Sequence, residues 1–124
     1  MDIIQGWQLN MHRCYSASVE LQRRLEHEAV FMALIQEPYT FGGLATINPS
    51  GSNVFQASIG AEERNRAVIV ASTSLKAWSV PEFTNNDMVT VALDCSIGTF
   101  WCSSVYMPGD SEEPPPPILS LIHI

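Results

Sequence analysis

A run of seven apolar residues, with a proline shortly after it, constrains the fold of this chain more than any other feature. The run covers residues 29–35, and Gln36-Glu37-Pro38 follow it directly. Seven apolar residues match the length of a strand buried on both faces. Proline has no N–H group and restricts the residue before it, so the strand is predicted to stop at Gln36, with Glu37 in an extended conformation.

Glu37 is thereby held at the carboxyl end of a buried strand. In α/β sheets, ligands bind at this edge, so Glu37 is a candidate active-site carboxylate. The plainer interpretation is a polar residue that ends a strand at the surface, and placement alone favours it.

The segments before this strand predict a βαβ unit. Residues 3–9 alternate imperfectly between apolar and polar side chains, which indicates a first strand. Apolar residues at helical spacing and the favourable Glu20–Arg24 pair predict an amphipathic helix over residues 15–27. With the buried strand over residues 30–36, they form a strand–helix–strand unit with parallel strands and a right-handed crossover.

The rest of the chain is rich in turns and short β segments. The β-rich runs lie at residues 54–59, 67–71, 77–80, 89–93 and 99–106. The last two runs are predicted to form an antiparallel hairpin. The chain is predicted to divide into a domain of residues 1–107, an extended, acidic and proline-rich connector of residues 108–117, and a short apolar tail of residues 118–124 that completes no domain.

Composition restricts the class of protein. The 124 residues suffice for one small domain with one modest core, and 46% of them are hydrophobic. The longest apolar run is too short to span a membrane and the N-terminus lacks the basic region of a secretory signal, so we expect an intracellular protein. Three cysteines without a C-x-x-C spacing indicate free thiols instead of a disulfide or zinc scaffold.

The charge balance bears on the partners of the chain. The formal net charge of −7 argues against a domain that binds nucleic acid by electrostatics alone. It is compatible with an enzyme that meets phosphate through a metal ion.

Three polar residues at strand ends form the candidate site. Asn10 ends the first strand and Glu37 ends the strand predicted beside it, so in a βαβ unit their side chains lie at the same edge. One carboxylate and one amide suit Mg²⁺, which keeps several waters and takes further oxygens from substrate phosphate. Tyr106 ends the last predicted strand. The plainer alternatives are a turn residue for Asn10 and a half-buried aromatic for Tyr106.

Other reactive residue types give weaker signals. His12 and His27 are predicted to lie at the surface or at a helix end, and His123 lies in the tail. Ser103-Ser104 has no partnered histidine and is predicted to fill a strand. The sequence contains no G-x-S-x-G, P-loop, H-E-x-x-H or paired-cysteine motif.

An ordered set of motifs resembles the endonuclease/exonuclease/phosphatase superfamily. More specifically, it resembles the apurinic-endonuclease-like domain in the pol protein of LINE-type (non-LTR), Jockey-like retrotransposons. The matching segments run in order from about residue 3 to residue 117. They are Gln8-Leu9-Asn10 with Arg13-Cys14, Gln36-Glu37-Pro38-Tyr39, Arg66-Ala67-Val68-Ile69-Val70, residues 84–91, and Ser104-Val105-Tyr106-Met107-Pro108.

The resemblance implies roles for three matching residues. Glu37 and Asn10 would hold Mg²⁺ or Mn²⁺, Glu37 as the carboxylate ligand and Asn10 as the residue that orients the site, and Tyr106 would approach the scissile phosphate. The implied chemistry is metal-assisted hydrolysis of a phosphodiester by an in-line water. In the parent element, which acts in the nucleus, this nicks DNA and frees a 3′ end for target-primed reverse transcription.

The resemblance also implies the fold class, α/β (α+β). The chain would be the N-terminal half of a four-layer α/β sandwich, with a βαβ start followed by antiparallel strands in one mixed sheet. The family's G-D-x-N and S-D-H motifs do not follow Pro117, so a truncated endonuclease that is inactive alone is expected. An inner sheet face with Val68, Val70, Val89 and Val91 would then stay exposed, which forfeits ~1.5–3 kcal/mol for each side chain.

Two other functions stay open. The chain is either a non-catalytic binding or scaffold fragment in which Glu37 and Tyr106 are merely inherited, or a relative that acts on RNA or on a lipid or inositol phosphodiester. Arg13-Cys14 and the proline-rich segment favour the retrotransposon branch. The tail of residues 118–124 departs from the family pattern and resembles unrelated sequence joined at a truncation or fusion. The oligomeric state stays open.

Overall fold

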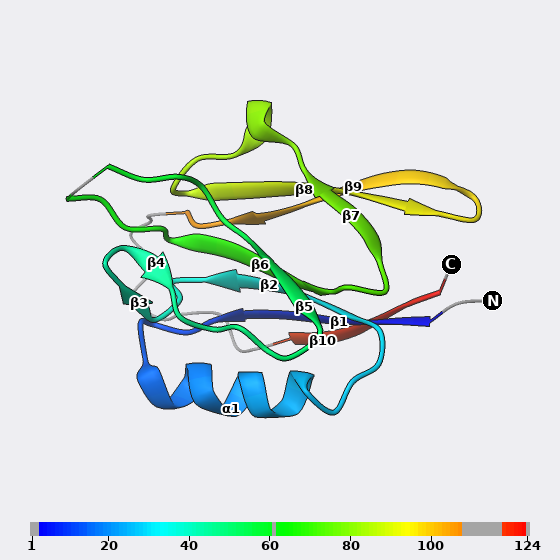
Figure 1. Cartoon of the computed structure of the whole chain (residues 1–124), viewed down its shortest axis with the longest axis horizontal. Helices are drawn as coiled ribbons and strands as arrows, with labels where there is room; N and C mark the ends of the chain where they lie inside the picture. Colours follow the sequence, from blue (N-terminus) through cyan, green and yellow to red (C-terminus); the bar gives the residue numbers. More distant parts are fainter. Residues whose placement is uncertain (1–2, 61, 108–117, 124) are drawn as a thin grey trace.

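The fold is a stack of three layers, formed by one helix, a five-stranded mixed sheet and a three-stranded antiparallel sheet (Figure 1). The computed structural model describes residues 3–60, 62–107 and 118–123. Helix α1 (Tyr15–Leu25) covers one face of the larger sheet, and the smaller sheet lies over the opposite face (Figure 1). Within these residues, no helix combines the length and the hydropathy needed to cross a membrane.

The first sheet has the strand order β10-β1-β2-β6-β5. Its strands are β1 (Ile3–Asn10), β2 (Phe31–Gln36), β5 (Ser52–Phe55), β6 (Ala67–Ser72) and β10 (Ile118–His123). Strands β1 and β2 are parallel and α1 connects them, so the predicted βαβ unit is confirmed. Strand β2 pairs with β6 and β6 pairs with β5 in antiparallel register, which makes the sheet mixed.

The later strands form a separate sheet. Its members are β7 (Lys76–Ser79), β8 (Met88–Cys95) and β9 (Gly98–Val105), and β8 and β9 form the predicted hairpin. The prediction of one mixed sheet is therefore wrong. Strand β6 has β2 on one edge and β5 on the other, so β7 cannot pair with β6 as a hairpin and instead pairs with β8 in a new sheet. The remaining short elements are β3 (Thr40–Phe41), β4 (Leu44–Ala45) and the 3₁₀ helix η1 (Pro81–Phe83).

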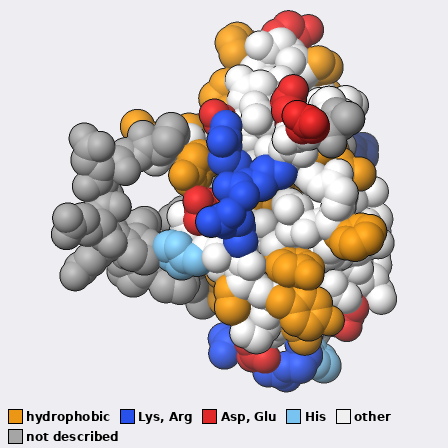
Figure 2. Space-filling model, turned by 90° about the vertical axis from the view of Figure 1, so that its left-hand side faces the viewer, with side chains coloured by type: hydrophobic (Ala, Val, Ile, Leu, Met, Phe, Trp, Pro, Cys, Tyr) orange, Lys and Arg blue, Asp and Glu red, His pale blue; other side chains and the backbone are white. Residues whose placement is uncertain are grey.

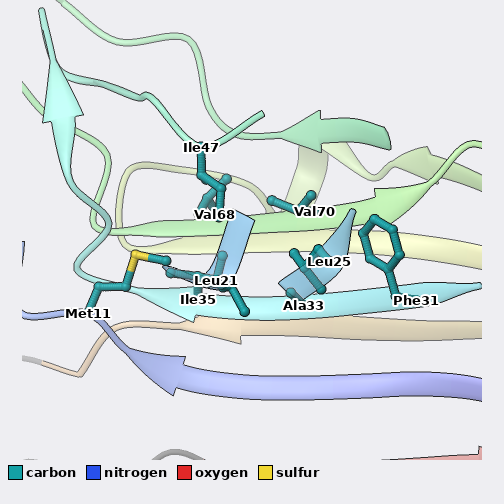
Figure 3. Close-up of a cluster of buried hydrophobic side chains, with 9 residues drawn as sticks. All are labelled: Met11, Leu21, Leu25, Phe31, Ala33, Ile35, Ile47, Val68 and Val70. Carbon is teal, nitrogen blue, oxygen red and sulfur yellow. The ribbon is translucent and has the colours of Figure 1, made fainter. Parts of the chain in front are cut away.

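One hydrophobic core lies between α1 and the first sheet (Figure 3). The helix ends at Leu25, two residues before the predicted end, and turns Leu21 and Leu25 toward the sheet. Alternate residues of β2 and β6 meet them, because successive side chains of a strand point to opposite faces. The buried members of this core are Met11, Leu21, Leu25, Phe31, Ala33, Ile35, Ile47, Val68 and Val70.

A second core lies between the two sheets, formed by the opposite face of the first sheet and by residues of β8. Its buried members are Ile4, Met32, Ala67, Ile69, Ala71, Val89, Val91 and Leu93. The prediction of an exposed inner face is wrong, because Val68, Val70, Val89 and Val91 each have an exposed fraction of 0%. The reason is that α1 covers one face of the first sheet and the second sheet covers the other.

The apolar tail takes part in the first sheet, which its sequence does not predict. Ile118–His123 pairs with β1 in antiparallel register, from Ile3 opposite His123 to Gln8 opposite Ile118. Strand β1 thereby has a neighbour on each side. The connector of residues 108–117, for which an extended conformation is predicted, lies outside the described residues.

Candidate active site

The carboxyl ends of β1 and β2 bring Asn10 and Glu37 to one edge of the first sheet. Asn10 is the register partner of Gln36, the residue before Glu37. The N–H of Met11 also donates to the carbonyl oxygen of Gln36 at 2.9 Å, which keeps the two chain ends together beyond the strands. The predicted shared edge for Asn10 and Glu37 is therefore confirmed, and their roles remain predictions.

Glu37 has a left-handed backbone, with φ = 47°, so the predicted extended conformation is wrong. Two backbone hydrogen bonds hold it there: its N–H donates to Arg66 O at 2.8 Å, and its carbonyl oxygen accepts from Arg13 N–H at 2.9 Å. The strand does stop at Gln36, as predicted. The Glu37 side chain has an exposed fraction of 17%, so the carboxylate is largely enclosed while it still reaches solvent.

Backbone strain concentrates at this edge. Among the residues that the structure describes, the non-glycine residues with positive φ are His12 (52°), Arg13 (57°) and Glu37 (47°). A non-glycine residue in this region costs on the order of 1–3 kcal/mol, and such residues cluster at active sites and ligand clamps. The tight turn after β1 and the end of β2 thus have the backbone signature of a functional site.

Asn10 and His12 organise the turn after β1. The Oδ1 atom of Asn10 accepts a 2.8 Å hydrogen bond from the N–H of His12, which is the turn role that the sequence offers as an alternative. His12 is exposed, as predicted, but its Nδ1 lies 3.8 Å from Oε2 of Glu37. The sequence contains no sign of this proximity, because it depends on the left-handed turn.

Tyr106 reaches the same edge from the second sheet. It directly follows β9, and its N–H donates to Asp87 O at 2.8 Å. The guanidinium carbon of Arg66 lies 5.6 Å from the centroid of the Tyr106 ring, a cation–π arrangement. Arg66 immediately precedes β6, whose first residue, Ala67, is the register partner of Gln36. Tyr106 is thereby placed beside the residues that surround Glu37.

Arg66 contacts both Asp87 and Tyr106 at this edge. Its Nε donates a short hydrogen bond to Oδ1 of Asp87. This bond is the main cause of the raised pKa of Arg66, which partial burial opposes and the nearby Tyr106 and Glu37 increase further. Sequence pattern places Arg66 in a strand motif and Asp87 in the segment of residues 84–91 but assigns neither a role in the site, since their contact spans 21 residues and has no local signal.

A buried polar chain links the two sheets just behind the site. Gln36 accepts a 2.5 Å hydrogen bond from Nε2 of Gln8 and donates through its own Nε2 to Oγ of Ser104 at 2.9 Å. Ser104 in turn donates to the carbonyl oxygen of Ile35 at 2.8 Å and is fully buried. Ser103 and Ser104 lie in strand β9, as predicted, and the Ser104 hydroxyl also bridges β9 and β2.

The oxygen donors at this edge suit a hard cation in part. Glu37 contributes one carboxylate, and Oδ1 of Asn10 keeps a second lone pair beside the one used by His12. Residues 3–60, 62–107 and 118–123 contain no group of three or more His, Cys, Asp or Glu side chains placed to hold a metal ion. Mg²⁺ is commonly held by one or two carboxylates, with waters and substrate phosphate oxygens completing its shell, so Glu37 and Asn10 fit one side of such a site.

Comparisons with known proteins place the fold. No protein-family model matches the chain, and no curated protein matches it in sequence. Among solved structures, the chain is similar to the endonuclease domain of TRAS1, a telomere-specific non-LTR retrotransposon, with a TM-score of 0.64 and 25% sequence identity. The match covers 87% of this chain and 46% of the TRAS1 chain, so this chain spans about half of that structure. In fold, as in the order of its motifs, the chain is therefore similar to the endonuclease domain of LINE-type retrotransposons.

Proposed function

We propose that this chain carries one half of the active site of a metal-dependent phosphodiester endonuclease, which nicks DNA for a non-LTR retrotransposon. The observation that supports the proposal most is the meeting of Asn10, Glu37 and the Tyr106 segment at one edge, brought there by three different strands. The clustered left-handed residues at the same edge support it independently.

The chemistry assigned to this chain is positioning and charge control. Glu37 and Asn10 would hold Mg²⁺ or Mn²⁺, which when bound neutralises charge on the phosphate and on the leaving oxygen. Tyr106 would approach the phosphate from the second sheet, with its backbone fixed by Asp87. The groups that would activate the attacking water belong to the G-D-x-N and S-D-H motifs, which this sequence does not contain.

A nicking assay on supercoiled plasmid with Mg²⁺ tests the proposal. The chain alone is expected to give no nicking above background. A version extended through the two absent motifs is expected to nick, and Glu37→Gln in that version is expected to lower the rate about 100-fold or more, as when one charge-stabilising group is removed.

The matched control is Glu82→Gln in the extended version, which removes an exposed carboxylate from η1 and is expected to leave the rate unchanged. Nicking that survives Glu37→Gln would refute the assignment. An extended chain that cleaves RNA or a lipid phosphodiester, but leaves the plasmid intact, would keep the site and change the substrate.

A further inference from the structure

Arg66 presents an unused hydrogen-bonding fork beside Glu37. A guanidinium group has five N–H donors in a fixed plane. Asp87 accepts from Nε, and within the described part of the chain the Nη groups make no hydrogen bond or ion pair. The Arg66 side chain is 33% exposed, so it reaches solvent with four N–H donors that no described residue engages.

Two contacts fix the orientation of this fork. The hydrogen bond to Asp87 holds Nε, and the guanidinium carbon lies over the ring of Tyr106, 5.6 Å from its centroid. A guanidinium held from two sides loses little conformational entropy when it binds a ligand. Asp87 itself is held in place, because its N–H donates to Oδ1 of Asn85 at 2.8 Å and its carbonyl oxygen accepts from Tyr106.

The charge distribution favours an anion here despite the net charge of −7. Basic side chains gather on the face of the molecule at which β1 and β2 end, with acidic side chains around them (Figure 2). Arg13 follows β1 and Arg66 precedes β6 at this edge, whereas Arg23 and Arg24 pair with Glu20 on α1. A local group of cationic side chains is thus present at this edge although the net charge of the chain is negative.

We propose that the Nη groups of Arg66 bind two non-bridging oxygens of a phosphodiester and hold it next to Glu37, and that Asp87 is a positioning residue that aims this fork. Parallel N–H donors match the geometry of two phosphate oxygens, which explains why a planar fork suits this ligand class. This inference rests on the proposed function, since it names the residue that would hold the substrate of the same site.

The test measures binding without cleavage. A short fluorescent DNA duplex is titrated with the chain in EDTA over a series of salt concentrations, and anisotropy gives the Kd. Arg66→Gln is expected to weaken binding about 10-fold, as for the loss of a charge-assisted hydrogen-bonded pair. It is also expected to reduce the slope of log K against log salt by about 0.9, the contribution of one phosphate contact. Lys76→Gln removes the same charge from β7 and is the control, with a change in Kd below about twofold.

Asp87→Ala separates positioning from simple charge. It makes the net charge of the chain one unit more positive, so long-range attraction alone would tighten DNA binding. If Asp87 orients the guanidinium group of Arg66, its loss would instead weaken DNA binding. We expect weaker binding. Arg66→Lys keeps the charge but loses the planar fork, and it is expected to retain the salt slope with a Kd raised about threefold or more.

Each result of the binding experiments either supports or overturns the inference. An unchanged Kd in Arg66→Lys, or tighter binding in Asp87→Ala, overturns the inference, and Arg66→Lys decides it if Arg66→Gln does not fold. Because no metal and no cleavage are involved, these results do not depend on the nicking assay. If the Arg66 variants lose binding but the extended chain never nicks, the proposed endonuclease function is overturned, whereas phosphodiester binding by Arg66 is supported.

Discussion

Gln36 donates a 2.9 Å hydrogen bond to Oγ of Ser104, and this bond joins the two sheets directly behind the candidate site. Gln36 precedes Glu37, and Ser104 lies two residues before Tyr106. Both partners are buried, with exposed fractions of 7% and 0%. The bond therefore ties together the two strands from which Glu37 and Tyr106 follow.

Replacing Ser104 is expected to weaken this link. Ser104→Ala removes the acceptor of Nε2 of Gln36 and one donor to the carbonyl oxygen of Ile35, and a buried unsatisfied group costs about 1–3 kcal/mol. We expect the free energy of unfolding to fall by about that amount in urea denaturation. Ser103→Ala is the matched control, since Ser103 is exposed and its hydroxyl, among the described residues, shares a hydrogen bond only with Thr90; it should cost less than half as much. Equal costs for the two variants would contradict the role of Ser104.

Local sequence pattern predicts the elements of this fold better than their assembly. The apolar run and the proline locate β2 to within one residue, because both signals act on the strand itself. The division into two sheets depends on which strands occupy the edges of β6, and no local pattern encodes that choice. For the same reason the sequence does not predict that Val89 and Val91 are covered.

Some residues of the candidate site can likewise be predicted from local sequence pattern, and others cannot. Asn10 and Glu37 can be found from the sequence, because a strand end is a local feature and parallel strands end at one edge. Arg66, Asp87 and Ser104 act through contacts between segments far apart in the chain. Only the turn-like run Asn85-Asn86-Asp87 could have drawn attention to Asp87, and such runs are common in loops.

Two neighbouring glycines should differ sharply when replaced by alanine. Gly42 and Gly43 both have positive φ, 61° and 83°, so alanine at either position is strained. A Cβ on Gly42 meets nothing within 4 Å, whereas a Cβ on Gly43 overlaps a carbonyl oxygen of Glu63 and the side chain of Ile59. We expect a loss of about 1 kcal/mol for Gly42→Ala and of about 3 kcal/mol for Gly43→Ala, by urea denaturation.

The reason for testing Gly43 is its proximity to Arg66. Its carbonyl oxygen accepts from the N–H of Asn65 at 2.8 Å, so displacing Gly43 moves the residue before Arg66. Gly43→Ala is therefore also expected to weaken DNA binding at a temperature at which it remains folded. Similar stability for the two alanine variants would contradict the close approach.

The outer face of the second sheet is expected to bind hydrophobic dyes. Trp78 and Trp101 are both register partners of Ala92, so they share one face, and they are 48% and 59% exposed. Phe83 of the short helix η1 packs on Trp101 with ring centroids 5.8 Å apart, and α1 lies on the opposite side of the molecule (Figure 1). Contiguous exposed apolar surface of this kind binds dyes and partners.

Substitutions on the two faces of this sheet should therefore separate dye binding from stability. Trp101→Ser is expected to reduce dye fluorescence markedly with little change in thermal stability. Leu93→Ala on the inner face is expected to cost about 2–5 kcal/mol without lowering dye fluorescence in the folded state. Dye binding that is unaffected by Trp101→Ser would show that the accessible apolar surface lies elsewhere.

Helix α1 should become less stable in acid because of Glu20. Its carboxylate accepts hydrogen bonds from Arg23 at 2.7 and 3.1 Å and from Arg24 at 3.0 Å. These bonds lower the pKa of Glu20 from 4.5 to about 2. Because the pKa is lower in the folded chain than in the unfolded chain, the stabilisation is complete above about pH 4.5 and is lost as the pH falls toward 2.

Circular dichroism and urea denaturation across this pH range test the prediction. Glu20→Gln is expected to flatten the pH dependence of stability, whereas Glu82→Gln, which changes an exposed carboxylate on η1, should leave it as it is. Added salt should reduce the difference between the wild-type chain and Glu20→Gln, since exposed ion pairs are screened. A pH dependence that is the same in both variants would show that the Glu20 pairs do not stabilise the helix in solution.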